Sequence, residues 1–350
     1  MRSTPTPSPP RRRCLSLLSA FLVLLLCPNA NARQTQLLPP PPPPPLAPQQ
    51  PPSPEVISRV TAAKTIFLSN AGGNDYFNGE IPGGPNVSYN QLYAALQQWG
   101  YFQLVDSPAH ADLIFQIHGA ETAPNLVQTP DNLHIIAQQH QPLLVLTILN
   151  PANLALIDTI TAPAARDNSV PKGAIAFARS IEWLNYQIST RVSAPRPDPT
   201  QLKSRDTLRP SFETLIQFTA PVPPQVLNAK NIYLQNNDPA GRNPNPRSDA
   251  ARDLDGFRGA LDTWGFYHQT DSAQSADLIL QYHDDPANGT YLTLNDPATK
   301  AILWTITDPH HGFYHQSGAH RVTALNQNLI TLLKQLNHIP LTPAETAALH

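Results

Sequence analysis

The sequence predicts an α+β (α/β-like) fold made of two tandem, duplicated domains, each a mixed β-sheet with two packed helices. Two stretches carry this prediction: residues 99–118 read WGYFQLVDSPAHADLIFQIH, and residues 264–283 read WGFYHQTDSAQSADLILQYH. Half of the aligned positions are identical. The wide spacing between the stretches indicates a duplicated domain, because solenoid repeats recur at much shorter periods. The order of apolar patterns within each copy predicts β-α-β-β-β-α.

Each copy begins with a strand and a helix. The segments AKTIFLSN at 63–70 and AKNIYLQN at 229–236 have the β-branched and aromatic content of strands. In the first copy, Ser88 and Gln91 have the spacing of a capping box, which predicts the start of the helix. The Trp-Gly pair that opens both repeated stretches predicts its end. The tryptophan would be the last core residue of the helix, and the glycine would take a left-handed conformation.

The second half of each copy predicts a strand, a hairpin and a closing helix. Asp112 and Asp277 begin their strands, and we expect them to cap the strand starts. The alternative for the first copy is that Asp106 and Asp112 form a carboxylate pair for acid–base chemistry. The hairpins at 142–161 and 290–307 turn at Asn-Pro-Ala-Asn and Asp-Pro-Ala-Thr. The closing helices have apolar faces made of Ala174, Phe177, Ile181, Leu184 and Ile188, and of Val322, Leu325, Leu329, Leu332 and Leu336.

The first 32 residues have the pattern of a signal peptide. Three arginines precede a short apolar run at 14–27, and Ala30-Asn31-Ala32 offers a cleavage site. The apolar run is too short for a stable membrane-spanning helix, which needs about 20 residues. We therefore expect a secreted or periplasmic protein. Both cysteines lie in this segment, so the rest of the chain has no disulfide framework. Whether Cys27 is lipidated stays open.

Proline-rich stretches mark the expected boundaries between the parts of the chain. The sequence predicts a signal peptide (1–32), a proline-rich disordered spacer (33–61), a first repeat domain (62–192), a linker (193–226), a second repeat domain (227–338) and a C-terminal tail (339–350). The first copy also carries an insertion at 119–141, which is unusually long for a connection within a compact domain.

Charge excludes one class of partner. Four of the 23 Lys and Arg residues lie in the predicted signal peptide and none of the 25 acids does, which leaves 19 basic and 25 acidic side chains elsewhere. A general nucleic-acid binder needs a basic surface, so we expect no nucleic-acid partner. The sequence also has no polybasic patch for a membrane surface, so membrane contact is expected only through signal-peptide targeting.

Three motifs of the second copy carry a resemblance that covers most of residues 62–338. They are Ala276-Asp277-Leu278, Asp296-Pro297-Ala298-Thr299 and Trp304. The pattern resembles secreted proteins of unknown function from acidobacterial soil bacteria, and more distantly a family of cell-envelope lipoprotein domains. The first copy departs from it with Asn150, Asn153 and Asp158 at the corresponding positions. The resemblance implies the fold and an envelope location, and it implies no reaction.

One loop of the second copy is rich in histidine. It reads DPHHGFYHQSGAH, where His310, His311 and His315 are candidate metal ligands. His118 and His283 occupy the same position in both copies, which favours a structural role. The glycine-rich loop at 71–85 does not match a dinucleotide fingerprint. We find no catalytic motif and expect no bound cofactor.

These observations favour an exported cell-envelope protein that is a non-catalytic binding or scaffold module. Its partner would be an envelope protein or a small ligand. Two alternatives stay open: a metal-binding protein that uses the His-rich loop at 310–320, and a hydrolase with an unrecognised site. The sequence does not give the oligomeric state.

Overall fold

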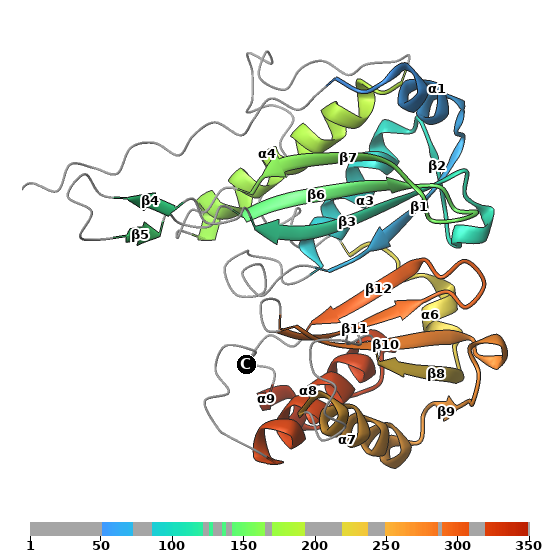
Figure 1. Ribbon diagram of the computed structural model, residues 1–350, viewed down its shortest axis with the longest axis vertical. Coiled ribbons are helices and arrows are strands. Elements are labelled where there is room, and N and C mark those ends of the chain that lie inside the picture. Colours follow the sequence, from blue (N-terminus) through green and yellow to red (C-terminus); the bar gives the residue numbers. More distant parts are fainter. Residues whose placement is uncertain are drawn as a thin grey trace, which may run out of the picture. The chain divides into compact units, whose positions relative to one another are not determined.

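A computed structural model of the chain contains two five-stranded mixed sheets with their helices (Figure 1). This confirms the predicted α+β fold with two tandem sheet domains. Within the ranges given below, no helix is both long and apolar enough to cross a membrane. The structure describes residues 51–72, 86–121, 126–128, 135–137, 142–164, 170–192, 219–236, 249–285, 289–307 and 319–348.

The first domain has the sheet order β2-β1-β3-β6-β7. Strand β1 runs parallel to β2 and β3, whereas β6 and β7 continue the sheet antiparallel. Helices α3 and α4 cover one face (Figure 1). The short edge strand β2 and helix α1 are additions to the predicted element order. The elements are α1 (Pro54–Ala62), β1 (Thr65–Asn70), α3 (Val87–Trp99), β2 (Gln103–Val105), the 3-10 turn η1 (Pro108–His110), β3 (Leu113–Glu121), β6 (Pro142–Leu149), β7 (Leu156–Pro163) and α4 (Val170–Ser189).

The second domain repeats this strand order as β9-β8-β10-β11-β12. Strand β8 is parallel to β9 and β10, and β11 and β12 are antiparallel. The elements are α6 (Pro224–Asn228), β8 (Asn231–Asn236), α7 (Asp249–Trp264), β9 (His268–Gln269), η2 (Ala273–Ser275), β10 (Leu278–Asp285), β11 (Gly289–Asn295), β12 (Ile302–Thr307), α8 (Ala319–Leu336) and α9 (Pro343–Ala348). The insertion in the first copy forms a separate small sheet from β4 (Leu126–Gln128) and β5 (Ile135–Ala137).

The Trp-Gly pairs end helices α3 and α7, as the sequence predicts. Gly100 and Gly265 have φ values of 67° and 68°. Their N–H groups donate to the carbonyls of Leu96 and Leu261 at 3.0 and 2.9 Å. For a residue with a Cβ, this left-handed conformation would cost roughly 1–2 kcal/mol. The glycines therefore let the chain turn directly from each helix into its edge strand.

The predicted capping box at Ser88 and Gln91 is wrong. Helix α3 begins at Val87, and its N-cap residue, Asn86, makes no side-chain cap bond. The Asn86 Oδ1 atom instead accepts a hydrogen bond from Asn70 Nδ2 at 2.7 Å, which ties the helix start to the end of β1. Because the helix starts earlier, Ser88 and Gln91 lie inside its first turns, and both are buried.

An aspartate carboxylate caps the start of β3 in the first domain and of β10 in the second. Asp112 Oδ2 accepts from the backbone N–H groups of Lys64 and Thr65 at 2.7 and 2.9 Å. Asp277 Oδ2 accepts in the same way from Lys230 and Asn231 at 2.9 and 2.8 Å. These bonds confirm the predicted cap at the strand start. They also occupy the Asp112 carboxylate that the alternative hypothesis paired with Asp106.

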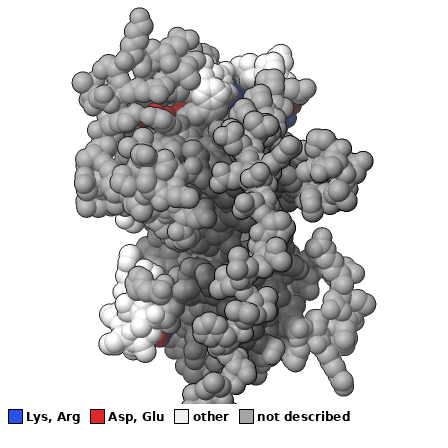
Figure 2. Space-filling view, turned by 90° about the vertical axis from the view of Figure 1, so that its left-hand side faces the viewer, with Lys and Arg blue, Asp and Glu red and all other residues white. Residues whose placement is uncertain are grey.

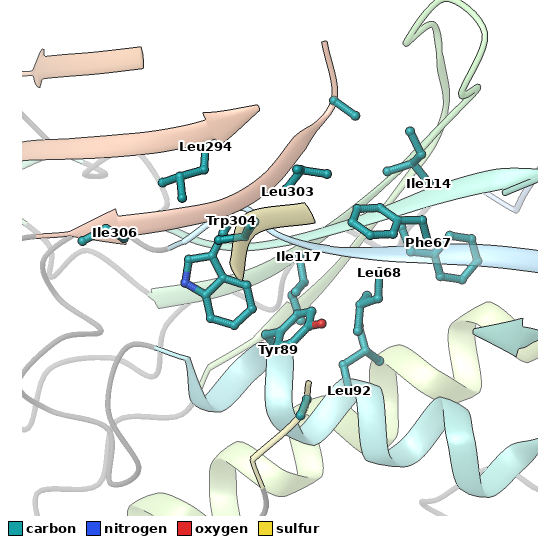
Figure 3. Packing of buried hydrophobic residues seen from close by; sticks show 14 of the residues in the cluster. Phe67, Leu68, Tyr89, Leu92, Ile114, Ile117, Leu294, Leu303, Trp304 and Ile306 are labelled. Carbon is teal, nitrogen blue, oxygen red and sulfur yellow. The ribbon is translucent and has the colours of Figure 1, made fainter. Parts of the chain in front are cut away.

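The two sheets share one hydrophobic core. The hydroxyl of Ser69 in β1 donates to the carbonyl of Ile302 in β12 at 2.5 Å. The Trp304 ring meets the Tyr89 ring edge-on, with centroids 5.0 Å apart (Figure 3). At Gly72, an added Cβ would lie 2.7 Å from the Thr305 methyl group. This close contact of β12 with β1 and α3, which we call the seam, joins the domains.

Two expected boundaries differ from the structure. The sequence predicts a disordered spacer through residue 61, but α1 begins at Pro54, and Val56 N–H donates to Ser53 Oγ at its start. Its Val60 is fully buried. The expected linker ends inside the core, because Ala220 N–H donates to Asn90 Oδ1 at 3.1 Å. Apolar burial and specific hydrogen bonds override the proline-rich composition in both places.

The end of the chain is also more ordered than the expected tail. Helix α9 opens with a capping box, in which Thr342 N–H donates to Glu345 Oε2 at 2.8 Å and Glu345 N–H donates to Thr342 Oγ1 at 3.3 Å. Lys334 Nζ donates to Glu345 Oε1 at 2.6 Å. The Lys334 bond, together with those from Thr342, lowers the pKa of Glu345 to about 2.

Replacing Asp277 by alanine should weaken the fold in a pH-dependent way. Hydrogen bonds from Asn231 and Lys230 lower the pKa of Asp277, so its stabilisation is complete above the unfolded value of about 3.9 and is lost as pH falls through the lowered folded value. Because the side chain is exposed, we expect a loss of about 1 kcal/mol near pH 7. Urea denaturation at about pH 7 and about pH 2.5 measures both values.

The control for this prediction is Asp255→Ala on the exposed side of α7. Among the described residues Asp255 pairs with Arg258, at 3.7 Å, and its side chain is 75% exposed. We expect almost no change in the free energy of unfolding for this variant. Equal losses for the two variants, or a loss at Asp277 that is independent of pH, would contradict the assigned role of the carboxylate.

Candidate functional site

An open hollow of about 640 Å³ lies at one end of the second domain. Three segments far apart in the sequence line it: helix α6, the turn before β10, and the hairpin loop between β11 and β12. This size is within the range of small-ligand sites. Its lining residues are Gln225, Asn228, Ala229, Gln274, Ala276, Asp277, Asp296, Pro297 and Ala298.

Gln225 and Asp296 form the inner part of the hollow. The Gln225 amide nitrogen donates to Asp296 Oδ1 at 2.9 Å and to the Asp277 carbonyl at 3.2 Å. Asp296 Oδ2 accepts from the N–H and the hydroxyl of Thr299 at 2.9 and 2.5 Å. Burial opposes ionisation of Asp296, but the bonds from Gln225, Thr299 and Ala298 hold its pKa below the ordinary value. The carboxylate is therefore ionised at neutral pH.

Two carboxylates lie among the described residues that line the hollow, Asp277 and Asp296. The pKa of Asp277 is also lowered, chiefly by the backbone bonds from Asn231 and Lys230. The Lys300 ammonium lies beside the hollow, where it donates to the Pro297 carbonyl at 2.6 Å. On the face that Figure 2 shows, charged atoms occupy only small areas among the described residues. The hollow suits a group that donates hydrogen bonds or carries positive charge.

The first copy serves as an internal comparison. The positions of Ala229, Ala276, Asp277 and the Pro-Ala pair of the loop carry the same residues in both copies. By contrast, Gln225, Asn228, Gln274 and Asp296 correspond to Arg59, Ala62, Ala109 and Asn150. The shared residues serve the fold that both copies have. The other four lining residues differ between the copies, so the shared fold does not specify their side chains.

Sequence analysis did not single out Gln225, Asn228 or Gln274. They lie on two elements that only folding brings together, α6 and η2, and Gln225 and Asn228 lie at or beside the end of the expected linker. One signal was available. All three positions have an uncharged polar side chain in the second copy and not in the first. A position-by-position alignment of the two copies therefore indicates them.

A second cluster of polar side chains lies on the second sheet. It is on the opposite face from Leu280 and Leu294. His283 Nε2 and Thr293 Oγ1 are 3.1 Å apart, and the His283 ring stacks on Tyr291 at 4.3 Å. Gln281 links this pair to Gln235, with its amide nitrogen 3.3 Å from Gln235 Oε1. The first sheet has His118, Gln116 and Thr147 at the matching positions. Burial lowers the pKa of His118. Both copies carry this His-Gln-Thr set, so it does not distinguish one domain from the other.

The other sequence-based candidates have these outcomes. His310, His311 and His315 lie outside the described residues, as do residues 73–85 of the glycine-rich loop. In the described part of the chain, no group of three or more His, Cys, Asp or Glu side chains could hold a metal ion. Asp106 has His110 as its ionic neighbour at 3.9 Å, so the structure does not bring Asp106 and Asp112 together as a carboxylate pair.

Comparison with known proteins gives little. No protein-family model matches the chain, and no curated protein matches it. One solved structure is similar in part: a dodecamer of a point-substituted PelC from Paraburkholderia phytofirmans, with 12% sequence identity, 36% of this chain and 87% of that chain covered, and a TM-score of 0.22. A likeness of this extent carries no argument about function.

Asp296 should tolerate asparagine better than alanine. The Asn150 side chain makes the corresponding turn bond in the first copy, where its Oδ1 accepts from Ala152 N–H at 3.0 Å. We expect Asp296→Ala to lower the free energy of unfolding by about 2 kcal/mol, because the N–H groups of Thr299 and Gln225 lose a charged acceptor. Asp296→Asn should cost less than about 1 kcal/mol. Urea denaturation measures both, and equal losses would contradict this account of the loop.

Proposed function

We propose that this protein is an exported, non-catalytic binding module of the bacterial cell envelope, and that the hollow of the second domain is its binding site. The observation that supports the proposal is the difference between the two copies. Residues that maintain the fold are shared, while four residues around the hollow differ between the copies, and two of them, Asn228 and Gln274, replace alanines of the first copy. A duplicated domain that keeps its core and changes the lining of one hollow is typical of a binding role.

The chemistry of the hollow indicates the class of ligand. Two ionised carboxylates and three amide side chains would accept hydrogen bonds from an amine, a guanidinium or an amide group. A peptide segment with a Lys or Arg side chain carries such groups, and so does an amino sugar. The ionised carboxylates would repel a phosphate or carboxylate ligand.

Binding can be tested with a variant that copies the first domain. Gln225→Arg together with Asn228→Ala introduces the residues found at Arg59 and Ala62. The arginine would place a positive charge against Asp296. Arginine amide, titrated into isotopically labelled protein, should shift backbone resonances of α6 and of the loop at 296–298 in the wild type. We expect the double variant to lose at least about tenfold in affinity, which corresponds to about 1.4 kcal/mol.

The matched control is Arg59→Gln together with Ala62→Asn, which makes the reverse exchange in the first copy. Its affinity should equal that of the wild type. Shifts that are the same in all three proteins would contradict the hollow as the binding site. Acetylated glutamate serves as the anionic probe, and a response to it as strong as the response to arginine amide would contradict the proposed charge preference.

Export is tested by the N-terminus of the mature protein. We expect mass spectrometry of protein recovered from the periplasm or medium to show a chain that begins at Arg33, after cleavage at the Ala-Asn-Ala site. Replacing Ala32 by a bulky residue should block cleavage and leave the precursor with the membrane fraction. Wild-type protein that stays uncleaved in the cytoplasm would contradict the export part of the proposal.

A further inference from the structure

The seam uses different strands of the two sheets. In the first domain it involves β1, an inner strand, and in the second it involves β12, an edge strand. The two domains have the same fold, but each contributes a different strand to the seam. Each domain therefore also contains an unused strand, equivalent to the one that the other domain contributes. The unused counterpart of β12 is β7 in the first domain, and the unused counterpart of β1 is β8 in the second.

Burial differs between the strands of the seam and these counterparts. Ser69 and Phe67 of β1 are 0% and 1% exposed, because β1 is covered on both faces. Their equivalents in β8, Gln235 and Tyr233, are only partly buried. On the other side, Ile302 of β12 contributes its carbonyl to the seam, and its equivalent in β7 is Leu156. Leu156 is 64% exposed, the more exposed of the two large hydrophobic side chains at the surface of the described residues.

The two edge strands, β7 and β12, have the same local geometry. β7 and β12 each form the end of their sheet, and each has a register shift at the same place, between Ile148 and Leu149 or between Leu294 and Asn295. Leu156 pairs with Leu149 as Ile302 pairs with Asn295. The edge of β7 therefore repeats the backbone path with which β12 meets β1.

We propose that β7 of one molecule docks on β8 of a second molecule, so that copies of this chain associate head to tail through the unused counterparts of the seam. Leu156 would cover Tyr233, the equivalent of the buried Phe67 in β1. The Gln235 amide nitrogen would donate to the Leu156 carbonyl, as the Ser69 hydroxyl donates to the Ile302 carbonyl. Contacts of this kind close into rings or continue as filaments.

The intermolecular contact should be weaker than the seam within the chain. The ring pair of Trp304 and Tyr89 has no counterpart, because the equivalent residues are Asp158 and Leu254. Asp158 is already paired with the buried side chain of Arg191. Burial of Leu156 remains as the main apolar contribution. We therefore expect association that depends on protein concentration, rather than a permanent oligomer.

Sedimentation equilibrium of the purified protein over a range of concentrations tests the proposal. The average mass of the wild type should rise with concentration, and Leu156→Asp and Tyr233→Asp should each lower the association constant at least about tenfold. Leu156 is exposed and Tyr233 is partly buried, so circular dichroism with urea denaturation verifies that both variants fold. The matched control is Ile57→Asp in α1, at the other exposed large hydrophobic side chain (37% exposed), which should associate like the wild type.

Mixing the two variants separates a head-to-tail contact from a symmetric one. Leu156→Asp keeps an intact β8 surface, and Tyr233→Asp keeps an intact β7 edge. Their mixture should therefore form heterodimers with nearly wild-type affinity and nothing larger. A wild type that stays monomeric at all concentrations would overturn the proposal. So would association that Leu156→Asp does not weaken, or a mixture that does not associate.

Discussion

The burial of β1 on both faces is the constraint on which the rest of the structure depends. One face of the first sheet meets α3 and α4, and the other face of β1 meets β12 from the second domain. Every residue of β1 after Thr65 is buried, including the polar Ser69 and Asn70. Buried polar groups must be paired, and Ser69 satisfies this requirement through the Ile302 carbonyl. The strand that starts the first domain therefore needs the second domain to be complete.

The pairing at the seam explains why equivalent positions hold unlike residues. Trp304 packs against Tyr89, whereas Asp158 at the same position of the first copy pairs with Arg191. Tyr89 also donates its hydroxyl to the Pro221 carbonyl at 3.0 Å, and burial raises its pKa. The segment at 219–226 is thus held by the first domain just before it enters the second. Duplication supplied two similar sheets, and divergence at a few side chains made one core from them.

The hollow also depends on the segment that connects the two domains. Helix α6 is the last part of the connecting segment, and Gln225 on it reaches both the β10 start and the Asp296 loop. The Asp277 carboxylate that lines the hollow is also the cap of the strand start. One residue is therefore shared by the fold and the candidate site, whereas the fold of the first copy forms without the side chains of Gln225, Asn228 and Gln274.

The sequence by itself determined the duplicated sheet, the helix ends at Gly100 and Gly265, and the caps at Asp112 and Asp277. These features depend on contacts between near neighbours, or on a pattern that both copies repeat. Only the tertiary structure decided that α3 starts at Val87, that Ala220 belongs to the core, and that Gln225 and Asp296 meet. Those features depend on contacts between residues far apart in the chain, and the energy of such contacts exceeds local preferences without leaving a local signal.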